Sequence, residues 1–245
     1  HAGCGWFSPK TTVIPELQRL TVPSKLDETH KPAFEIRDMS WYENYHDNDL
    51  NAKLKLSGFR IKYPEEFGGM DRRWDCGVAE WTSNYLLPPK IYFDQHPDWY
   101  AMINGKRAKE HTQLCLSNPE VVDAVTSNVL KRISERYPAA KYYGIAQNDW
   151  WTFCECPACK AIDDYEGGPS GSIITFMNKV AERVERKYPD VIVHTFAYMY
   201  SLKPPKHVRG RPNTMVTLCT DACDFSKPIQ EHSRTFKRLN RINNL

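Results

Sequence analysis

The sequence lacks any hydrophobic run that approaches the ~18 consecutive apolar residues needed to cross a membrane as a helix. It also lacks a strong excess of one charge, because 33 basic and 30 acidic residues leave a net charge of +3. These charges are interspersed, whereas nucleic-acid-binding proteins usually carry basic residues in a patch or stripe. Neither a membrane span nor a nucleic-acid partner is therefore expected.

The chain also lacks an initiating methionine, since it begins at His1, and its first residues have no charged start followed by an apolar run. With 245 residues and 41% hydrophobic content, it is long enough for one sizeable core, in one large domain or two small ones. We expect a fragment of a longer protein. Residues 1–31, rich in Pro, Thr and Lys, read as a linker, and a folded domain is expected over residues 32–245.

A repeated alternation of helix and strand is the clearest pattern in the chain. Residues 118–138 predict a capped helix with one apolar face that ends at a proline, and a buried strand is expected at 141–147. The unit then repeats as an amphipathic helix over 173–189 and a strand over 191–198, followed by a third strand at 214–219. This rhythm is typical of parallel βα units.

Two topologies fit these units, a doubly wound sheet and a closed (β/α) barrel. No G-x-G-x-x-G motif follows a strand, so the usual marker of a nucleotide-binding sheet is missing. Polar and aromatic residues gather directly after the strands, where a barrel has its active site. The pattern therefore favours a barrel. A long loop over residues 57–90 is expected to contain little regular structure.

The strongest candidate site follows the strand at 141–147, where Asn148 and Asp149 precede Trp150 and Trp151. A carboxylate held against indole rings loses solvation, so its pKa rises and it can keep a proton for a leaving oxygen. Indole faces also stack on the apolar faces of sugar rings. The pattern predicts a catalytic Asp149 among substrate-binding neighbours. The alternative is that Asp149 caps a turn and the tryptophans fill the loop.

A second candidate lies at the end of a short strand expected over residues 33–38. Arg37 and Asp38 end this strand, where a guanidinium can hold a substrate carboxylate or a pair of hydroxyls. An ordinary ion pair at a strand end explains the same two residues equally well.

Three further residues are candidates for substrate binding. His96 and Trp99 belong to a polar and aromatic loop, although Trp99 fits a core position as well. Tyr198 ends the strand at 191–198, where a site role and a packing role fit equally. His194, inside that strand, is expected to be a core residue.

The eight cysteines are too sparse for a disulfide-stapled miniprotein, but three of them form a C-x-C-x-x-C motif. Cys154, Cys156 and Cys159 offer three thiolates, one fewer than a tetrahedral structural zinc site needs. The candidates for the fourth ligand are Cys115, Cys219 and Cys223. A local disulfide and reduced, buried thiols are the alternatives, and no other cofactor is expected.

Several segments resemble the bacterial domain-of-unknown-function family 4838 (DUF4838). These are PAFEIRDMSW, HPDWYAMINGKR and the run from YYGIAQNDWW to VIVHTFAY. The block N-D-W, C-x-C-x-x-C, G-S-x-x-x-F-x-N is the most specific part, and the likeness covers nearly the whole chain. That family is similar to the catalytic barrel of the family 67 α-glucuronidases and, more distantly, to β-hexosaminidases. The opening GCGWFSPKTTVIP looks like the tail of the small α/β domain that precedes such a barrel.

The resemblance implies a (β/α)8 TIM barrel in a secreted or periplasmic protein that acts on a glycan or an oligosaccharide containing uronic acid. Residues 32–245 would be the N-terminal part of the barrel, with about three strands beyond Leu245. The remaining strands and the N-terminal domain of the same protein are then the expected partners, and the fragment alone is expected to be poorly stable and inactive. Arg37 matches the family's substrate-contacting arginine. Asn148 and Asp149 fall where the relatives carry an acidic residue, a Glu in an S-E-G context in the α-glucuronidases.

Glycoside cleavage usually needs two carboxylates, and Asp149 supplies only one. Other carboxylates near strand ends or in the loop after Trp151 are candidates for the second: Asp38, Asp94, Glu155, Asp163, Asp164, Glu166, Asp221 and Asp224. We therefore expect a glycoside hydrolase. The alternatives are a non-catalytic carbohydrate-binding barrel and a zinc-organised interaction module.

Overall fold

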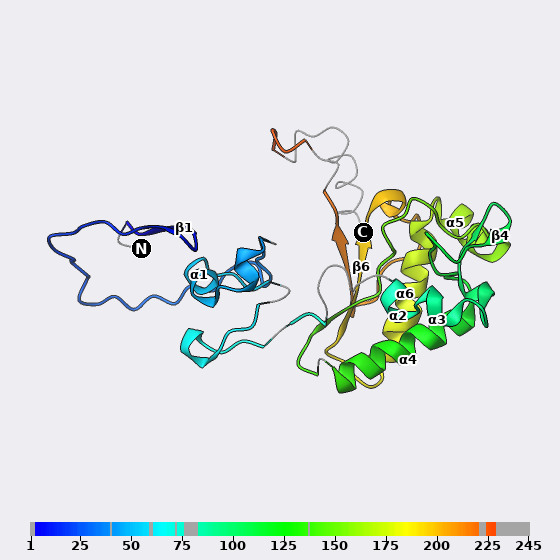
Figure 1. Ribbon diagram of the computed structural model, residues 1–245, viewed down its shortest axis with the longest axis horizontal. Helices are drawn as coiled ribbons and strands as arrows, with labels where there is room; N and C mark the ends of the chain where they lie inside the picture. Colours follow the sequence, from blue (N-terminus) through cyan, green and yellow to red (C-terminus); the bar gives the residue numbers. More distant parts are fainter. Residues whose placement is uncertain are drawn as a thin grey trace. The chain divides into compact units, whose positions relative to one another are not determined.

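A computed structural model describes residues 3–39, 41–58, 61–71, 73–75, 83–136, 138–220 and 224–228 of the chain (Figure 1). The chain divides into two compact units, His1–Arg73 and Trp74–Leu245. The parallel βα units expected from the sequence all belong to the second unit.

The first unit contains a small antiparallel hairpin and one short helix. The hairpin pairs β1 (Gly5–Ser8) with β2 (Thr11–Val13), and α1 (Asn48–Lys53) is capped by Asp47, whose carboxylate accepts from Leu50 N at 2.8 Å. Single 3₁₀ turns lie at η1 (Glu43–Tyr45) and η2 (Glu65–Phe67). A satellite cluster of Leu56, Ile61 and Tyr63 provides its buried apolar contacts.

The strand expected at residues 33–38 is not formed, and this prediction is wrong. The segment is irregular, and its backbone bonds to a loop instead of to a neighbouring strand. Ser57 provides both bonds, from its N–H to the Arg37 carbonyl at 2.9 Å and from its hydroxyl to the Glu35 carbonyl at 2.6 Å. A short alternation of apolar and polar residues makes a strand only where a partner strand is present to complete the ladder.

The second unit is built on a parallel sheet whose strand order follows the chain order. It consists of β5 (Tyr142–Gly144), β6 (Ile192–Ala197) and β7 (Thr214–Leu218), with β6 in the middle. Trp74 adds a parallel bridge to Tyr142 on the outer side of β5, and Asp75 N donates to the Tyr142 carbonyl at 3.0 Å. Three of the strands predicted from the sequence are thus confirmed, the first two shortened at both ends and the third by one residue at its carboxyl end.

Helices α4 (Pro119–Glu135) and α6 (Ser170–Glu185) pack against each other and cover one face of this sheet (Figure 1). Asn118 caps α4 by accepting from Glu120 N at 2.9 Å, as its sequence position predicts. The apolar stripe of α4 meets α6 and the helix-facing strand residues in one core, which includes Val121, Val125, Val129, Tyr143, Met177, Val180 and Val193.

Several elements of the second unit were not expected from the sequence. The most important is α5 (Pro157–Glu166), which replaces part of the expected loop between β5 and α6. The others are short: α2 (Ser83–Leu86), α3 (Pro89–Tyr92), η4 (Pro97–Trp99), β3 (Met102–Ile103), β4 (Lys106–Arg107) and η5 (Met199–Ser201). β3 and β4 form an antiparallel hairpin whose turn, Asn104-Gly105, has positive φ at both residues.

A buried ion pair joins the sheet to α4. Arg132 lies 3.2 Å from the Asp75 carboxylate, which also accepts from Gly144 N at 3.3 Å, and Asp75 is 1% exposed.

Among the helices of the described residues, none is long and apolar enough to span a membrane.

Candidate functional site

The carboxyl ends of β5 and β6 are joined by one buried side chain, Gln147. Its amide nitrogen donates to the Tyr198 carbonyl at 3.1 Å and to Ser201 Oγ at 2.7 Å. Ser201 in turn accepts from Tyr198 N at 3.1 Å. The loops that follow these two strands are therefore fixed relative to each other.

Asn148, the next residue, is 3% exposed and acts as a clasp between three segments. Its amide nitrogen donates to the Thr112 carbonyl at 2.7 Å and to Asn84 Oδ1 at 3.1 Å, while its Oδ1 accepts from Asn84 N at 3.1 Å. Its main chain bonds to the side chain of Gln113 in both directions. Both amide hydrogens of Asn148 are thus used within the protein, so the structure places this predicted substrate-binding residue in a supporting position.

Beyond this clasp, residues 149–151 form the exposed part of the segment, which we call the site loop. Asp149 is exposed, so the desolvation expected from the flanking indole rings is not seen. Trp151 is 72% exposed and Trp150 is 37% exposed, with one face of Trp150 against His111 at 4.2 Å between ring centroids. Two large aromatic side chains and a carboxylate are therefore presented together to solvent.

The far end of the site loop is also held. Thr152 donates to the carbonyl of His111, a residue with a φ of +49°, at 3.2 Å. Phe153 packs on Tyr200, with ring centroids 5.3 Å apart, and Cys154 is buried. The exposed residues thus stand between two anchored ends.

The other predicted substrate-binding residues are distributed over the chain. Trp99 lies in the hydrophobic core and its Nε1 donates to Glu120 at 2.9 Å, which is the packing alternative left open by the sequence. His96 stacks on Trp99 at 3.9 Å between centroids. Tyr198 is half-buried at the end of β6, next to the Gln147 bridge.

Arg37 and Asp38 belong to the first unit. The Arg37 guanidinium donates to the backbone carbonyls of Lys55 and Phe34 at 2.7 and 2.5 Å. Asp38 packs against Gly58, where a Cβ atom would lie 1.9 Å from the carboxylate oxygen. The two residues thus help to fold residues 33–58.

The carboxylates that were candidates for a second catalytic group mostly have structural partners. Glu155 accepts from Asn104 N at 2.8 Å, and Asp164 pairs with Lys160 at 2.8 Å. Asp94 pairs with Lys109 at 2.7 Å, and Asp224 accepts from Ser226. Asp221 lies outside the described residues.

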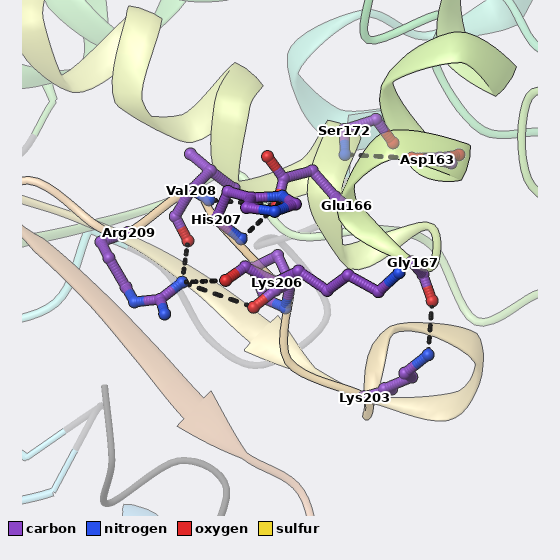
Figure 2. A network of polar contacts seen from close by, with 10 residues as sticks. Asp163, Glu166, Gly167, Ser172, Lys203, Lys206, His207, Val208 and Arg209 are labelled. Atoms are coloured by element: carbon purple, nitrogen blue, oxygen red, sulfur yellow. Dashed lines mark hydrogen bonds and ion pairs between the residues drawn. The ribbon is translucent and has the colours of Figure 1, made fainter.

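Asp163 and Glu166, both buried on α5, bond to backbone N–H groups of neighbouring segments (Figure 2). Asp163 accepts from Ser172 N, at the start of α6, at 3.1 Å. Burial raises the pKa of Asp163, and the hydrogen bond from Ser172 offsets part of that rise. Burial also opposes ionisation of Glu166, but bonds from the N–H groups of His207 and Val208, at 2.7 and 3.0 Å, lower its pKa overall. These carboxylates hold α5, α6 and the following loop together.

The four buried cysteines Cys115, Cys154, Cys156 and Cys159 form the cysteine cluster. Their sulfur atoms all lie within 4.8 Å of one another, and Cys115 Sγ is 3.6 Å from Cys156 Sγ and 4.0 Å from Cys159 Sγ. Cys115 is therefore the fourth member of the set that the C-x-C-x-x-C motif begins. Cys219, an earlier candidate, follows β7 and is not part of the cluster, and Cys223 lies outside the described residues.

The sulfur atoms of the cluster are surrounded by hydrogen-bond donors. Cys156 caps α5 and accepts from Cys159 N at 3.5 Å, and Cys154 accepts from Met102 N at 3.4 Å. The guanidinium of Arg107 lies 4.0 Å from Cys154 Sγ. Backbone N–H groups, a helix N-terminus and a cation all favour thiolate over thiol.

The protonation of the cluster is strongly uneven. Hydrogen bonds from Cys154 and Cys159 hold the pKa of the Cys115 thiol far below its usual range. The bond to Cys115 in turn raises the pKa of Cys154 to about 11 and that of Cys159 further still. The four sulfurs in such close contact cannot all be ionised unless a cation lies among them.

Sequence reasoning missed Gln113 and Arg107, and it left Cys115 as one of three candidates for the fourth ligand. No local pattern marks Gln113 or Arg107, because each acts on residues more than 30 positions away. Cys115 is isolated in the sequence, and the folded structure selects it from those candidates, since its sulfur lies 3.6 Å from Cys156 Sγ.

Comparison with known proteins identifies a family but no function. The family model described as a domain of unknown function (DUF4838) matches residues 6–244, almost the whole chain. This match confirms the family resemblance found in the sequence, while the further likeness to the family 67 α-glucuronidases stays a prediction. No curated protein matches the chain.

Proposed function

This chain belongs to the family described as a domain of unknown function (DUF4838), and we propose that it acts on glycans as a glycoside hydrolase. The proposed sugar site is the site loop at residues 149–151. The observation that carries the proposal is that two indole rings and a carboxylate are exposed on a segment whose two ends are anchored in buried structure.

Such an arrangement suits sugar binding for two physical reasons. Indole rings supply a large apolar face for a sugar ring, and a carboxylate accepts hydrogen bonds from its hydroxyls. The Asn148 clasp fixes the loop before a ligand arrives, so little conformational entropy is lost on binding. Exposed tryptophans on an anchored loop are therefore better explained by a ligand than by folding.

We also propose a (β/α)8 barrel as the complete fold. Trp74, β5, β6 and β7 lie side by side in chain order and run parallel, with both helices on one face. A barrel has this order throughout, whereas a doubly wound sheet reverses it at a switch point. The site loop follows the carboxyl end of β5, the edge at which barrel enzymes have their active sites.

In the proposed reaction, Asp149 donates a proton to the glycosidic oxygen as the bond to the anomeric carbon breaks, and a water adds to that carbon. A second carboxylate must take up the proton of that water. If Asp149 instead orients the sugar by accepting hydrogen bonds from its hydroxyls, both the proton donor and the base of the hydrolysis must be other carboxylates.

A non-catalytic carbohydrate-binding protein is the second candidate. It is favoured by the exposure of Asp149 and by the structural partners of Glu155, Asp163, Asp164 and Glu166. Both candidates use the same aromatic surface, and they differ in whether a glycosidic bond is cleaved.

The proposal includes one bound ion, a structural Zn²⁺ at the cysteine cluster. Four cysteine thiolates are a ligand set of structural zinc sites, in which no position is left for substrate. The α-glucuronidase likeness adds the proposal that the protein works in the cell envelope or outside the cell.

The test is hydrolysis of a panel of 4-nitrophenyl glycosides, glucuronides included, by the full-length protein with its complete barrel and by its Asp149→Asn variant. Loss of nitrophenol release in Asp149→Asn, with sugar binding retained, supports the hydrolase. Equal release by both proteins removes Asp149 from the reaction. Binding of sugars without release by the wild type supports the non-catalytic candidate.

A further inference from the structure

The dimensions of the cysteine cluster fit a single tetrahedral ion. A Zn–S distance of about 2.3 Å places the sulfurs of a tetrahedral site ~3.8 Å apart, and the cluster has separations of 3.6 and 4.0 Å with all sulfurs within 4.8 Å. Its four residues are between 1% and 5% exposed, so the site is closed to solvent. Closed four-coordinate sites are structural.

The charge of such a centre needs compensation. Zinc with four thiolates carries a net charge of −2, and a buried charge is costly unless it is paired or hydrogen-bonded. Arg107, half-buried on β4, is the cation placed to balance it: one of its N–H groups donates to the Tyr100 carbonyl at 2.7 Å, and the same nitrogen lies 4.0 Å from Cys154 Sγ. The Tyr100 bond fixes the orientation of the guanidinium.

The backbone supplies the remaining compensation. Met102 N and Cys159 N donate to two of the sulfurs, and the N-terminus of α5 points its positive end at Cys156 and Cys159. Hydrogen-bond donors aimed at sulfur are expected for thiolates that bind a metal. They stabilise a disulfide much less, because its sulfurs carry no charge.

We propose that Cys115, Cys154, Cys156 and Cys159 bind one Zn²⁺ and that Arg107 is the positioning residue that balances the charge of this centre. On binding, each sulfur that is still protonated gives up its proton to solvent, and no electron is transferred. The proposal rests on the structural zinc included in the proposed function. It adds the counter-cation Arg107 and the backbone donors that compensate the charge of the four thiolates.

The centre also has a defined place in the fold. Its ligands come from the strand-like segment before α4, the segment after the site loop and the first turn of α5. The hairpin β3–β4 is tied to the same point, since Glu155 N donates to the Met102 carbonyl at 2.8 Å and Glu155 accepts from Asn104 N. Because Cys154 is three residues beyond Trp151, the bound ion is a further anchor of the site loop on that side, beside the Thr152 and Phe153 contacts.

The experiment begins with zinc content by mass spectrometry of the wild-type chain, purified without chelators, together with an absorption spectrum after Co²⁺ replacement. One zinc per chain and the thiolate-to-cobalt charge-transfer band of a tetrahedral site support the ligand set. A metal-free protein with disulfides among these cysteines overturns the proposal. Cys219→Ala, outside the cluster, is expected to keep its zinc.

The counter-cation is tested by competition with a chromophoric chelator. Arg107→Gln is expected to lower zinc affinity about 10- to 100-fold, Arg107→Lys less, and Lys106→Gln, the exposed neighbour on the same strand, not at all. Equal affinities in Arg107→Gln and wild type overturn the role of Arg107. Neither result depends on glycan binding, so failure of the proposed glycan function would leave a tightly bound zinc in place.

Discussion

Gln113 and Asn148 bond to each other in both directions: Asn148 N donates to Gln113 Oε1 at 2.8 Å, and Gln113 Nε2 donates to the Asn148 carbonyl at 3.0 Å. A side-chain amide thereby replaces the strand partner that the backbone of residue 148 lacks after β5 has ended. Both residues are at most 4% exposed, so no water can take over either bond. The position of the site loop depends on this pair.

Replacing Gln113 by Leu should therefore destabilise the chain by about 2 kcal/mol, because the buried Asn148 N–H loses its acceptor. The Asn148 carbonyl loses one of its two donors and keeps the bond from Trp150 N at 2.8 Å. Urea unfolding followed by circular dichroism measures this difference. Gln95→Leu, at an exposed position, is the control and should change the free energy of unfolding by less than ~0.5 kcal/mol. Similar effects of the two substitutions would show that the clasp is not needed.

The buried pair of Asp75 and Arg132 gives a second prediction. Arg132→Met leaves a carboxylate that is 1% exposed without its cation, which should cost about 3–5 kcal/mol. Lys131→Met, next to it on α4 but 68% exposed at the side chain, should be near neutral. Chemical denaturation of both variants measures the difference.

A double variant makes this test specific. Asp75→Asn removes the charge that Arg132→Met leaves unpaired, so the combined substitution should be less destabilising than the sum of the two. Strict additivity would mean that the two residues do not stabilise each other.

The sequence predicted the parts of this fold that depend on local pattern. The helices around Val125 and Val180 and the three parallel strands were recognisable because one apolar face repeats at a fixed period. Helix α5 was missed because its two buried carboxylates, Asp163 and Glu166, make its buried face read as polar. Their partners, Ser172 and the 207–208 backbone, are visible only in three dimensions.

The candidate site, like the fold, could be predicted from the sequence only where its residues are neighbours in the chain. The exposed carboxylate and tryptophans after β5 and three of the four clustered cysteines could be assigned from sequence, since each set is contiguous in the chain. Cys115, distant in sequence, could be named only as one of three candidates for the fourth ligand. Asn148 was assigned to the substrate, whereas its amide bonds Asn84 and Thr112. A residue type alone does not tell whether its polar atoms point toward a ligand or toward distant backbone.

Asp163 and Glu166 should respond to pH in opposite directions. The folded-state pKa of Glu166 is lowered, so its stabilising effect is complete above the usual glutamate pKa of about 4.3 and is lost as the pH falls through the folded value. Glu166→Gln should therefore be less stable than wild type at pH 7, and the difference should shrink in acid (Figure 2).

Burial raises the pKa of Asp163, so its ionised form costs stability above the folded pKa and the cost disappears as the pH falls below the unfolded value. Asp163→Asn keeps an oxygen for Ser172 N and should be at least as stable as wild type at pH 7. Thermal midpoints of both variants between pH 3 and pH 8 (roughly the range set by these carboxyl groups) measure the two trends. Parallel pH profiles for the two variants would contradict this account.

The most direct test of the proposed sugar site is calorimetric titration of the wild-type chain, Trp151→Ala and Tyr165→Ala with the oligosaccharides that the wild type binds best in a glycan panel. Trp151 and Tyr165 are both highly exposed, at 72% and 65%, so neither substitution should disturb folding. The account predicts that Trp151→Ala loses about 10-fold or more in affinity, the loss of one stacked ring, while Tyr165→Ala binds as the wild type does. Unchanged affinity in Trp151→Ala, or a wild-type chain that binds no glycan in the panel, would contradict it.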